Sequence, residues 1–371
     1  MNARNLRNAT MRSLALSFPK TARTNDFFRR EVPEVVASFE ERALGKVWNV
    51  DRGAGRPLGA FETEMLPYLS DPFRGTTLRR VLAADESALT MELPAARAAL
   101  EAAGIGIEDV DLLMSCTFPS AQTGIGESAF LARELGHRGA AWNLESACSS
   151  ALVGLDVANA LVQAGRHRRI LVLTSCIYSR VTDPADTLSW TSGDGAAAFV
   201  VEAGSDGAEV VATCNTHTAE TCGALSFELV GRSDGAVMRM VTFPGAADAL
   251  REVAERTVDE LCRGAARAAG ISLADVRIFA CNSPAAWFSA FIARKLGVDR
   301  ERVIDTYPRY ANVGPVLWPA ALHEAACAGR LRPGDYVMLY SVGSVASSSA
   351  AVLRWGNVGV GALPPAPEIL L

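Results

Sequence analysis

An internal repeat constrains the fold of this chain more than any other feature. The segment AAGIGIEDVDLLMSC (residues 102–116) resembles AAGISLADVRIFACN (268–282), and AGRHRRILVLTS (164–175) resembles AGRLRPGDYVMLYS (328–341). Residue 268 stands 166 positions after residue 102, and residue 328 stands 164 positions after residue 164. Each segment is typical of a helix end followed by a buried strand. The sequence therefore predicts two halves of similar topology.

The repeat also indicates the fold class and a boundary. Apolar runs rich in Val, Ile and Leu alternate with Ala-rich segments of helical period, which predicts α/β layers. A third pair of similar segments, 192–204 and 344–356, predicts a strand near the end of each half. We place the halves at 1–205 and 206–371 and expect them to pack as one body, since no low-complexity linker separates them.

Composition excludes several classes of function. The chain has 371 residues, and its net charge of -5 contains no long block of one sign, so neither nucleic acid nor a membrane surface is an expected partner. No apolar run is long enough to span a bilayer, and the N-terminus has no apolar signal region. The eight cysteines form no C-x-x-C pair and the four histidines no H-x-x-x-H pair. We therefore expect a cytoplasmic protein with reduced thiols, no metal site and no bound cofactor.

Two residues occupy equivalent positions in the repeat. Cys148 lies 16 residues before Ala164, and Asn312 lies 16 residues before Ala328. Each is expected at the start of a central helix, and Asn282 is expected just past a strand of the second half. Two-fold pseudo-symmetry can bring Cys148, Asn312 and Asn282 into one crevice.

Cys148 is either a buried packing residue or a nucleophile, and its position alone leaves both open. Buried free cysteine is common in protein cores. A helix N-terminus, however, favours a thiolate and lowers the cysteine pKa from about 8.5. Its backbone N–H groups can also hold an oxyanion. The small neighbours in SACSS (146–150) leave room for a thioester.

Several motifs in order resemble the β-ketoacyl-acyl carrier protein synthase III (KAS III)-like branch of the thiolase superfamily. They are DPFRGTTLRRVLAADESALTMELPAARAALEAAG (71–104), ESACSSALVGL (145–155), TSGDGAAAFVVE (191–202), YANVGPVLWPAALHEA (310–325) and GSVASSSAAVLRWG (343–356). This resemblance covers most of the chain. It implies the thiolase fold, five layers in the order α-β-α-β-α built from two pseudo-symmetric halves, and a homodimer.

The resemblance also implies roles for individual residues. Cys148 matches the nucleophile that accepts an acyl group from a coenzyme A or carrier-protein thioester, and Asn312 matches the active-site asparagine. The amides of Gly343 and Cys148 match the oxyanion hole. Gln122 and Thr123 match the place where the family sends a residue across the dimer interface.

One position departs from the family pattern. Asn282 stands where the family has its catalytic histidine, and an amide can donate a hydrogen bond but cannot shuttle a proton. Ser283 and Trp287, together with Thr123, are candidate substrate-binding residues. Core packing is the more common use of an aromatic such as Trp287, and the same holds for Phe288 and Trp318. His217 can replace the histidine only if its loop approaches the crevice, and His323 is expected to face away from Cys148.

The leading hypothesis is an acyltransferase of specialised metabolism, of polyketide or related type. Cys148 would take an acyl group from a coenzyme A or acyl carrier protein thioester and pass it to a small-molecule acceptor in a ping-pong sequence. The first alternative is a carbon–carbon condensing enzyme in which Asn282 and Asn312 hold the enolate. The second is a non-catalytic partner subunit. The basic residues Arg133, Arg138 and Arg168 could meet an acidic carrier protein, although ordinary solvated charge explains them equally well.

Overall fold

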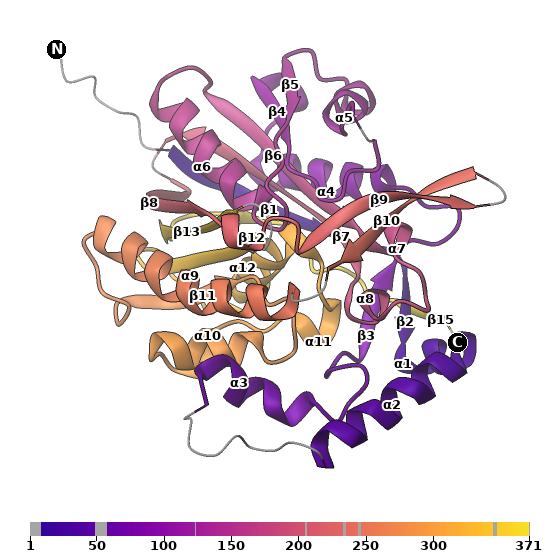
Figure 1. Ribbon diagram of the computed structural model, residues 1–371. Helices are drawn as coiled ribbons and strands as arrows, with labels where there is room; N and C mark the ends of the chain where they lie inside the picture. The colour runs from indigo at the N-terminus through magenta and orange to yellow at the C-terminus, as the bar shows by residue number, and fades with distance from the viewer. Residues whose placement is uncertain are drawn as a thin grey trace.

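The computed structural model describes residues 9–48, 58–122, 124–204, 206–232, 235–243, 246–343 and 347–370. Its largest element is a ten-stranded sheet that runs through both halves of the chain (Figure 1). Strongly apolar, β-branched runs such as RILVLTSCI (Arg169–Ile177) form its central strands and are buried over nearly their whole length.

The first half contributes one arm of this sheet. Its strands follow the order β5-β4-β6-β7-β1. They are β1 (Ala9–Ser17), β4 (Leu112–Ser115), β5 (Ala140–Asn143), β6 (Arg169–Ile177) and β7 (Asp194–Ala203). The strand β4 pairs in parallel with both β5 and β6, whereas β7 is antiparallel to β6 and β1.

The second half repeats this arrangement in the order β11-β12-β13-β8. Its strands are β8 (Ala208–His217), β11 (Val276–Cys281), β12 (Tyr336–Gly343) and β13 (Ser347–Arg354). A single parallel bridge from Phe279 to Val303 takes the place that β5 holds in the first half. The arms join where β1 meets β8, through the pairs Thr10–Glu209 and Met11–Ala208. The strand β7 ends at Ala203, so the predicted boundary after residue 205 falls between β7 and β8; as a domain division it stays a prediction.

Six helices complete the layers. The central pair is α6 (Ser150–Gln163) and α12 (Leu317–Cys327); α4 (Ala88–Ala103) and α5 (Ser128–Leu135) cover one outer face, and α9 (Ala246–Ala268) and α10 (Phe288–Leu296) cover the other. Leu155 of α6 and Leu322 of α12 share one buried core with strands of both arms. Figure 1 shows α4 and α5 at the upper right and α9 and α10 at the lower left. The predicted α-β-α-β-α thiolase architecture is confirmed.

The remaining elements lie around this body. A small sheet has the order β15-β2-β3, and β9 pairs with β10 in a protruding hairpin (Figure 1). The strands are β2 (Thr21–Thr24), β3 (Leu78–Val81), β9 (Leu225–Arg232), β10 (Gly235–Thr242), β14 (Gly359–Val360) and β15 (Glu368–Leu370). The helices are α1 (Asn25–Glu31), α2 (Pro33–Trp48), α3 (Ala60–Met65), α7 (Tyr178–Val181), α8 (Thr187–Thr191) and α11 (Tyr307–Tyr310). The 3-10 turns are η1 (Leu66–Tyr68), η2 (Ile107–Asp109), η3 (Ala219–Thr221), η4 (Arg300–Arg302) and η5 (Gly314–Val316). Within the described part of the chain, no helix is both long and apolar enough to cross a membrane.

Candidate active site

Cys148 lies two residues before the first residue of α6, and its side chain is only partly buried. The preceding Ala147 has φ of 49°, a left-handed conformation that costs a non-glycine residue energy and is typical of functional sites. The next residue, Ser149, is buried and donates hydrogen bonds to the carbonyls of Ser341 (3.3 Å) and Ser347 (2.8 Å). The turn that presents Cys148 is thus held by the second half of the chain.

Tyr178 is a site residue that the sequence motifs did not indicate. Its Oη lies 3.4 Å from Cys148 Sγ, and its ring is almost completely buried. Burial raises the pKa of the Tyr178 hydroxyl well above its ordinary value, and the nearby Cys148 and Cys176 raise it further. Tyr178 therefore stays protonated and can donate a hydrogen bond to the sulfur. Tyr178 directly follows β6, and residues at the carboxyl ends of strands often lie at binding sites, so this position could have indicated Tyr178 from the sequence.

The acidity of Cys148 differs from the expectation. A helix N-terminus was expected to lower the pKa of this thiol, but burial raises the pKa above its ordinary value. The hydrogen bond with Tyr178 and a backbone hydrogen bond oppose this rise without cancelling it. The resting group is a thiol, because burial disfavours the charged thiolate.

Asn282 holds the site together through its amide. Its Nδ2 donates to Ser341 Oγ (2.8 Å) and to the carbonyls of Cys148 (3.2 Å) and Gly314 (3.4 Å), while its Oδ1 accepts from the N–H of Trp318 (3.1 Å). Asn282 thereby links the start of α6 to the start of α12. These partners occupy both the Nδ2 and the Oδ1 of the Asn282 amide. A direct contact of Asn282 with substrate stays a prediction.

Asn312 presents its amide differently. It follows Ala311, whose φ of 56° is positive like that of Ala147. Asn312 Oδ1 accepts from the N–H of Gly314 (3.0 Å), and the side chain is only partly buried. Among the described residues, Asn312 Nδ2 has no hydrogen-bond partner. A Cβ added to Gly314 would lie 2.8 Å from Tyr178 Oη, which places the Asn312 turn against Tyr178 and hence near Cys148.

Gly343 ends β12 close to the Cys148 turn. A Cβ at this position would lie 2.1 Å from the Ser347 carbonyl, 2.7 Å from Ser149 Oγ and 3.0 Å from the Ser146 carbonyl. Only glycine therefore fits here without a shift of the backbone. This contact brings the Gly343 turn beside Cys148, as an oxyanion hole made of their two amides requires, and that role stays a prediction.

The predicted substrate-binding residues are placed unequally. Ser283 is completely buried and Trp287 is half-buried; Ser283 Oγ and Trp287 Nε1 are buried without a hydrogen-bond partner among the described residues. Thr123 lies outside the described residues, and its neighbour Gln122 lines a cavity of about 400 Å³. Trp318 is fully buried in the central core, which confirms packing as its use.

Among the described residues, neither His217 nor His323 makes a hydrogen bond with Cys148. His217 is exposed at the end of β8. His323 is buried on α12, and its Nε2 is 2.8 Å from the carbonyl of Gly361, so it faces away from Cys148 as expected. A second cavity, of about 1080 Å³, lies between α12 and the C-terminal segment, and Cys148 lines neither cavity.

Comparisons with known proteins fit this geometry. The family model for 3-oxoacyl-[acyl-carrier-protein (ACP)] synthase III matches residues 142–219, and the model for its C-terminal part matches 266–355. The β-ketoacyl-[acyl-carrier-protein] synthase III of Roseobacter denitrificans is 32% identical over 301 residues, which cover 76% of this chain and 88% of the relative.

Solved structures agree at the level of the fold. The 3-oxoacyl-(acyl carrier protein) synthase III of Pseudomonas aeruginosa PAO1 has a TM-score of 0.77 at 22% identity, covering 95% of this chain and 99% of its own. The priming β-ketosynthase of a polyketide biosynthetic pathway also has a TM-score of 0.77, at 21% identity, covering 96% of this chain and 98% of its own. With its duplicated fold and its cysteine at the start of a central helix, this chain belongs to the β-ketoacyl-acyl carrier protein synthase III family of acyl-transferring, condensing enzymes.

Proposed function

We propose that this protein is an acyltransferase of specialised metabolism that forms a thioester on Cys148 and passes the acyl group to a small-molecule acceptor. One observation carries the proposal. Cys148 keeps a hydrogen-bond donor, Tyr178 Oη, at 3.4 Å, whereas the position that matches the family's histidine holds Asn282, whose amide is bonded to backbone groups. Such a site can accept an acyl group but has no imidazole for the proton steps of condensation.

The two half-reactions balance without a further reactant. Cys148 Sγ attacks the carbonyl carbon of an acyl thioester, the bond to the donor's sulfur breaks, and the thiol proton leaves with the donor as free thiol. An amine or hydroxyl acceptor then attacks the new thioester, the carbon–sulfur bond breaks, and the acceptor's proton returns to Cys148. Asn312 Nδ2 and the Gly343 turn are the available donors for the oxyanion of each step.

A condensing enzyme is the second candidate, and the name of the relative that is 32% identical favours it. Condensation needs donors for the enolate that forms when a malonyl thioester loses carbon dioxide. Asn312 Nδ2 is open for this purpose, but the amide hydrogens of Asn282 are directed at Ser341 Oγ and at the carbonyls of Cys148 and Gly314. The proton steps would then fall to water or substrate. A silent partner subunit is disfavoured, because such a subunit has no need of Cys148 or of the strained Ala147.

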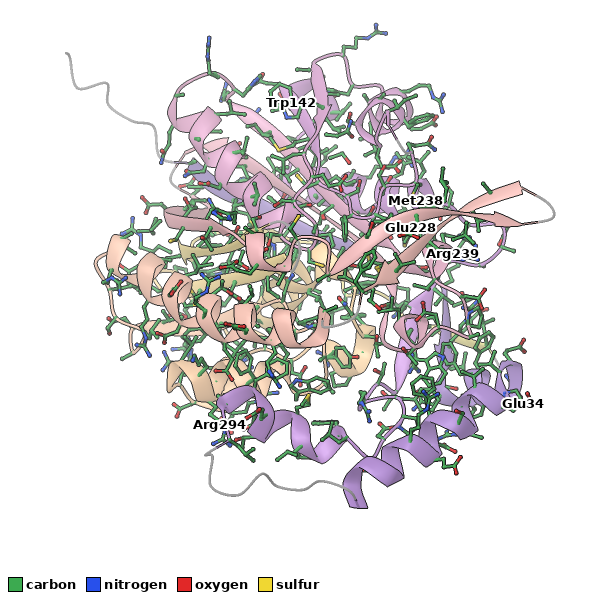
Figure 2. All side chains as sticks on the ribbon, in the orientation of Figure 1. Glu34, Trp142, Glu228, Met238, Arg239 and Arg294 are labelled. Atoms are coloured by element: carbon green, nitrogen blue, oxygen red, sulfur yellow. The ribbon has the colours of Figure 1, made fainter. Side chains whose placement is uncertain are left out.

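The surface around β5 supports a homodimer. The strand β5 is the edge strand of the sheet, and Ala140, Trp142 and Asn143 on it are exposed. Ile125 nearby is 66% exposed, and Figure 2 shows Trp142 at the upper edge of the molecule. An unpaired edge beside exposed apolar side chains is a template for pairing with a second copy.

We further propose a cytoplasmic location, in line with the reduced state of its eight free cysteines.

Intact-mass measurement tests the function. The purified protein and Cys148→Ala are incubated with acyl-coenzyme A and acyl-carrier-protein donors, with and without malonyl-carrier protein. We expect an adduct on the wild type alone, stable to malonyl-carrier protein and discharged by an amine or alcohol. Discharge with loss of carbon dioxide and formation of a β-ketoacyl product would replace the proposal by the condensing enzyme. Failure of every donor to label Cys148 would leave the silent subunit.

A further inference from the structure

The larger of the two cavities described above is separate from the chemistry at Cys148. Its volume is about 1080 Å³, and its wall is built from β3, η4, α11, α12 and the C-terminal segment. Cys148, Asn282 and Asn312 are not among the residues that line it. A cavity of this size can enclose a small organic molecule. We call it the Arg80 cavity, after the buried cation in its wall.

Arg80 carries a charge that no carboxylate compensates. The residue is only 4% exposed. Its Nη1 and Nη2 donate to the carbonyls of Pro19 (3.1 Å) and Pro365, its Nε is buried without a hydrogen-bond partner, and its guanidinium lies 5.7 Å from the ring centroid of Phe18. Among the described residues, Arg80 forms no ion pair. Buried charges are normally paired, so this guanidinium indicates an anion that a ligand brings.

The wall holds six other charged side chains, which balance one another. They are Arg300 with Asp305, Arg309 with Glu324, and Arg330 with Glu301. The first two couples are ion pairs, and in the third Arg330 donates to the backbone carbonyl of Glu301. Arg80 is therefore the charge in excess, and the wall favours a ligand with a negative charge.

Apolar groups form much of the remaining wall. Tyr310 stacks on Phe18 with ring centroids 4.1 Å apart, and Ile304 is buried beside the same cavity. Leu363 and Pro364 of the C-terminal segment also line it, and the Leu363 side chain is 59% exposed. Covering such a side chain removes apolar surface from water, which is favourable. The wall thus fits a ligand that has an apolar body next to its charge.

We propose that the Arg80 cavity is a second binding site of this protein, for a small organic anion with an apolar body, either an aliphatic carboxylate or a phosphate ester. The anionic end pairs with the Arg80 guanidinium, which keeps N–H groups beyond the two that bond to backbone carbonyls. The aliphatic part covers Ile304 and Leu363. Because the site is separate from Cys148, the inference does not depend on the proposed function.

Cys327 provides a probe of occupancy. It lines the Arg80 cavity and is exposed, whereas Cys222, which is also exposed, lies at the end of η3 and lines neither cavity. The test measures, by peptide mass mapping of the wild type at neutral pH, the rates at which N-ethylmaleimide modifies these two thiols. The added probes are octanoate, octyl phosphate and octan-1-ol.

We expect octanoate, octyl phosphate or both to protect Cys327. At about ten times its Kd an anion leaves about a tenth of the protein free, so modification of Cys327 should slow roughly tenfold, while Cys222 reacts at its usual rate. Which of the two anions protects at the lower concentration identifies the preferred head group. Octan-1-ol has the same apolar body without the charge, so it should need about a tenfold higher concentration.

Two variants test the role of Arg80. Arg80→Met should raise the half-protecting concentration of the anion about tenfold, because it removes the uncompensated charge. The double variant Arg309→Gln/Glu324→Gln is the matched control, since it removes an ion pair from the same wall without changing the net charge. It should protect within about twofold of the wild type.

Three results would overturn the proposal. The first is that neither anion protects Cys327, or that Cys222 is protected equally. The second is that octan-1-ol protects as well as the anions, and this comparison needs only the wild type, so it stands even if Arg80→Met does not fold. The third is a folded Arg80→Met that binds the anion like the double variant.

Discussion

The turns that lead into α6 and α12 share a positive φ and carry different chemistry. Ala147 and Ala311 both have a positive φ, and the next residue in each case, Cys148 or Asn312, is partly exposed. After Cys148 the chain continues with the buried Ser149, which bonds to the second half, whereas after Asn312 it continues with the glycine–proline turn η5. The duplicated fold therefore supplies two equivalent positions, to which the proposed function assigns a nucleophile and a hydrogen-bond donor.

A second pair of equivalent positions diverges further. Ser175 near the end of β6 corresponds to Ser341 near the end of β12. Ser341 Oγ donates to the Cys148 carbonyl (2.8 Å), whereas Ser175 Oγ donates to the buried Glu92 on α4 (2.6 Å). The same strand position thus supports the site in one half and a buried acid in the other. Substitutions in and around the site can show which properties come from the repeated fold and which come from the individual side chains.

Asn312→Ala should have the largest effect on catalysis. Loss of one oxyanion donor typically costs about 10²-fold in rate, and Asn312 Nδ2 is the side-chain amide open for this contact. The acylation rate of Cys148, followed by intact mass with an acyl-coenzyme A donor, is expected to fall by about this factor. A rate within twofold of the wild type would contradict the division of work between the Cys148 and Asn312 turns.

Asn282→Ala should mainly cost stability. It leaves the N–H of Trp318 without its acceptor and removes donors from Ser341 Oγ and from the carbonyls of Cys148 and Gly314. Each unsatisfied buried group costs about 1–3 kcal/mol, so the free energy of unfolding should fall by roughly 2–4 kcal/mol in urea titrations. An unchanged urea midpoint together with lost activity would instead make Asn282 a direct catalytic group.

Tyr178→Phe tests whether the Tyr178 hydroxyl lowers the pKa of the Cys148 thiol. The hydrogen bond from Tyr178 lowers the pKa of Cys148, so its removal should raise that pKa further and reduce the thiolate fraction at pH 8. Alkylation by iodoacetamide should then be several-fold slower, since one pKa unit is a tenfold change in thiolate. The full pH profile should move upward, with an unchanged limiting rate at high pH. A profile identical to that of the wild type would exclude Tyr178 from thiol activation.

Glu92→Gln should have the smallest effect, and this effect should grow as the pH rises from about 4.5 to 8. Burial raises the pKa of Glu92 to about 8, with the nearby Glu127 adding to the rise. The folded state therefore binds more protons than the unfolded state between about pH 4.5 and 8, and this carboxyl destabilises the wild type as the pH rises through that range. The stability of Glu92→Gln relative to the wild type should be greater at pH 8 than at pH 5, by about 1 kcal/mol or more. Equal differences at both pH values would show that Glu92 ionises as readily as an exposed residue.

Most of the fold could be predicted from the sequence because it is repeated. The similarity of 102–116 to 268–282 predicted matching strands, and the 16-residue spacing of Cys148 and Asn312 predicted their equivalence. These features depend on local periodicity within one copy and on comparison between copies. The helix α3 and the turn η1 have no counterpart in the repeat, so the sequence offered nothing against which to compare them.

The site could be predicted only in part. Cys148 lies at the expected start of α6, and Asn312 precedes the turn η5 that leads into α12. The contact of Tyr178 Oη with Cys148 Sγ, however, joins residues 30 positions apart and depends on packing at the end of β6. The expected fall in the pKa of Cys148 was wrong because the depth of burial is a property of the folded surroundings, not of the sequence near the helix. The positive φ angles of Ala147 and Ala311 likewise cannot be predicted from the amino-acid sequence around them.

The strand β15 pairs with β2, so that Glu368 lies beside Thr21 and Leu370 beside Arg23. During synthesis β15 leaves the ribosome after every strand of the large sheet. The small sheet can therefore be completed only after both arms have emerged, whereas the first arm of the large sheet has all its strands much earlier. A chain that lacks β15 should still build both arms but leave β2 with an open edge, which is a risk of mispairing between nascent chains.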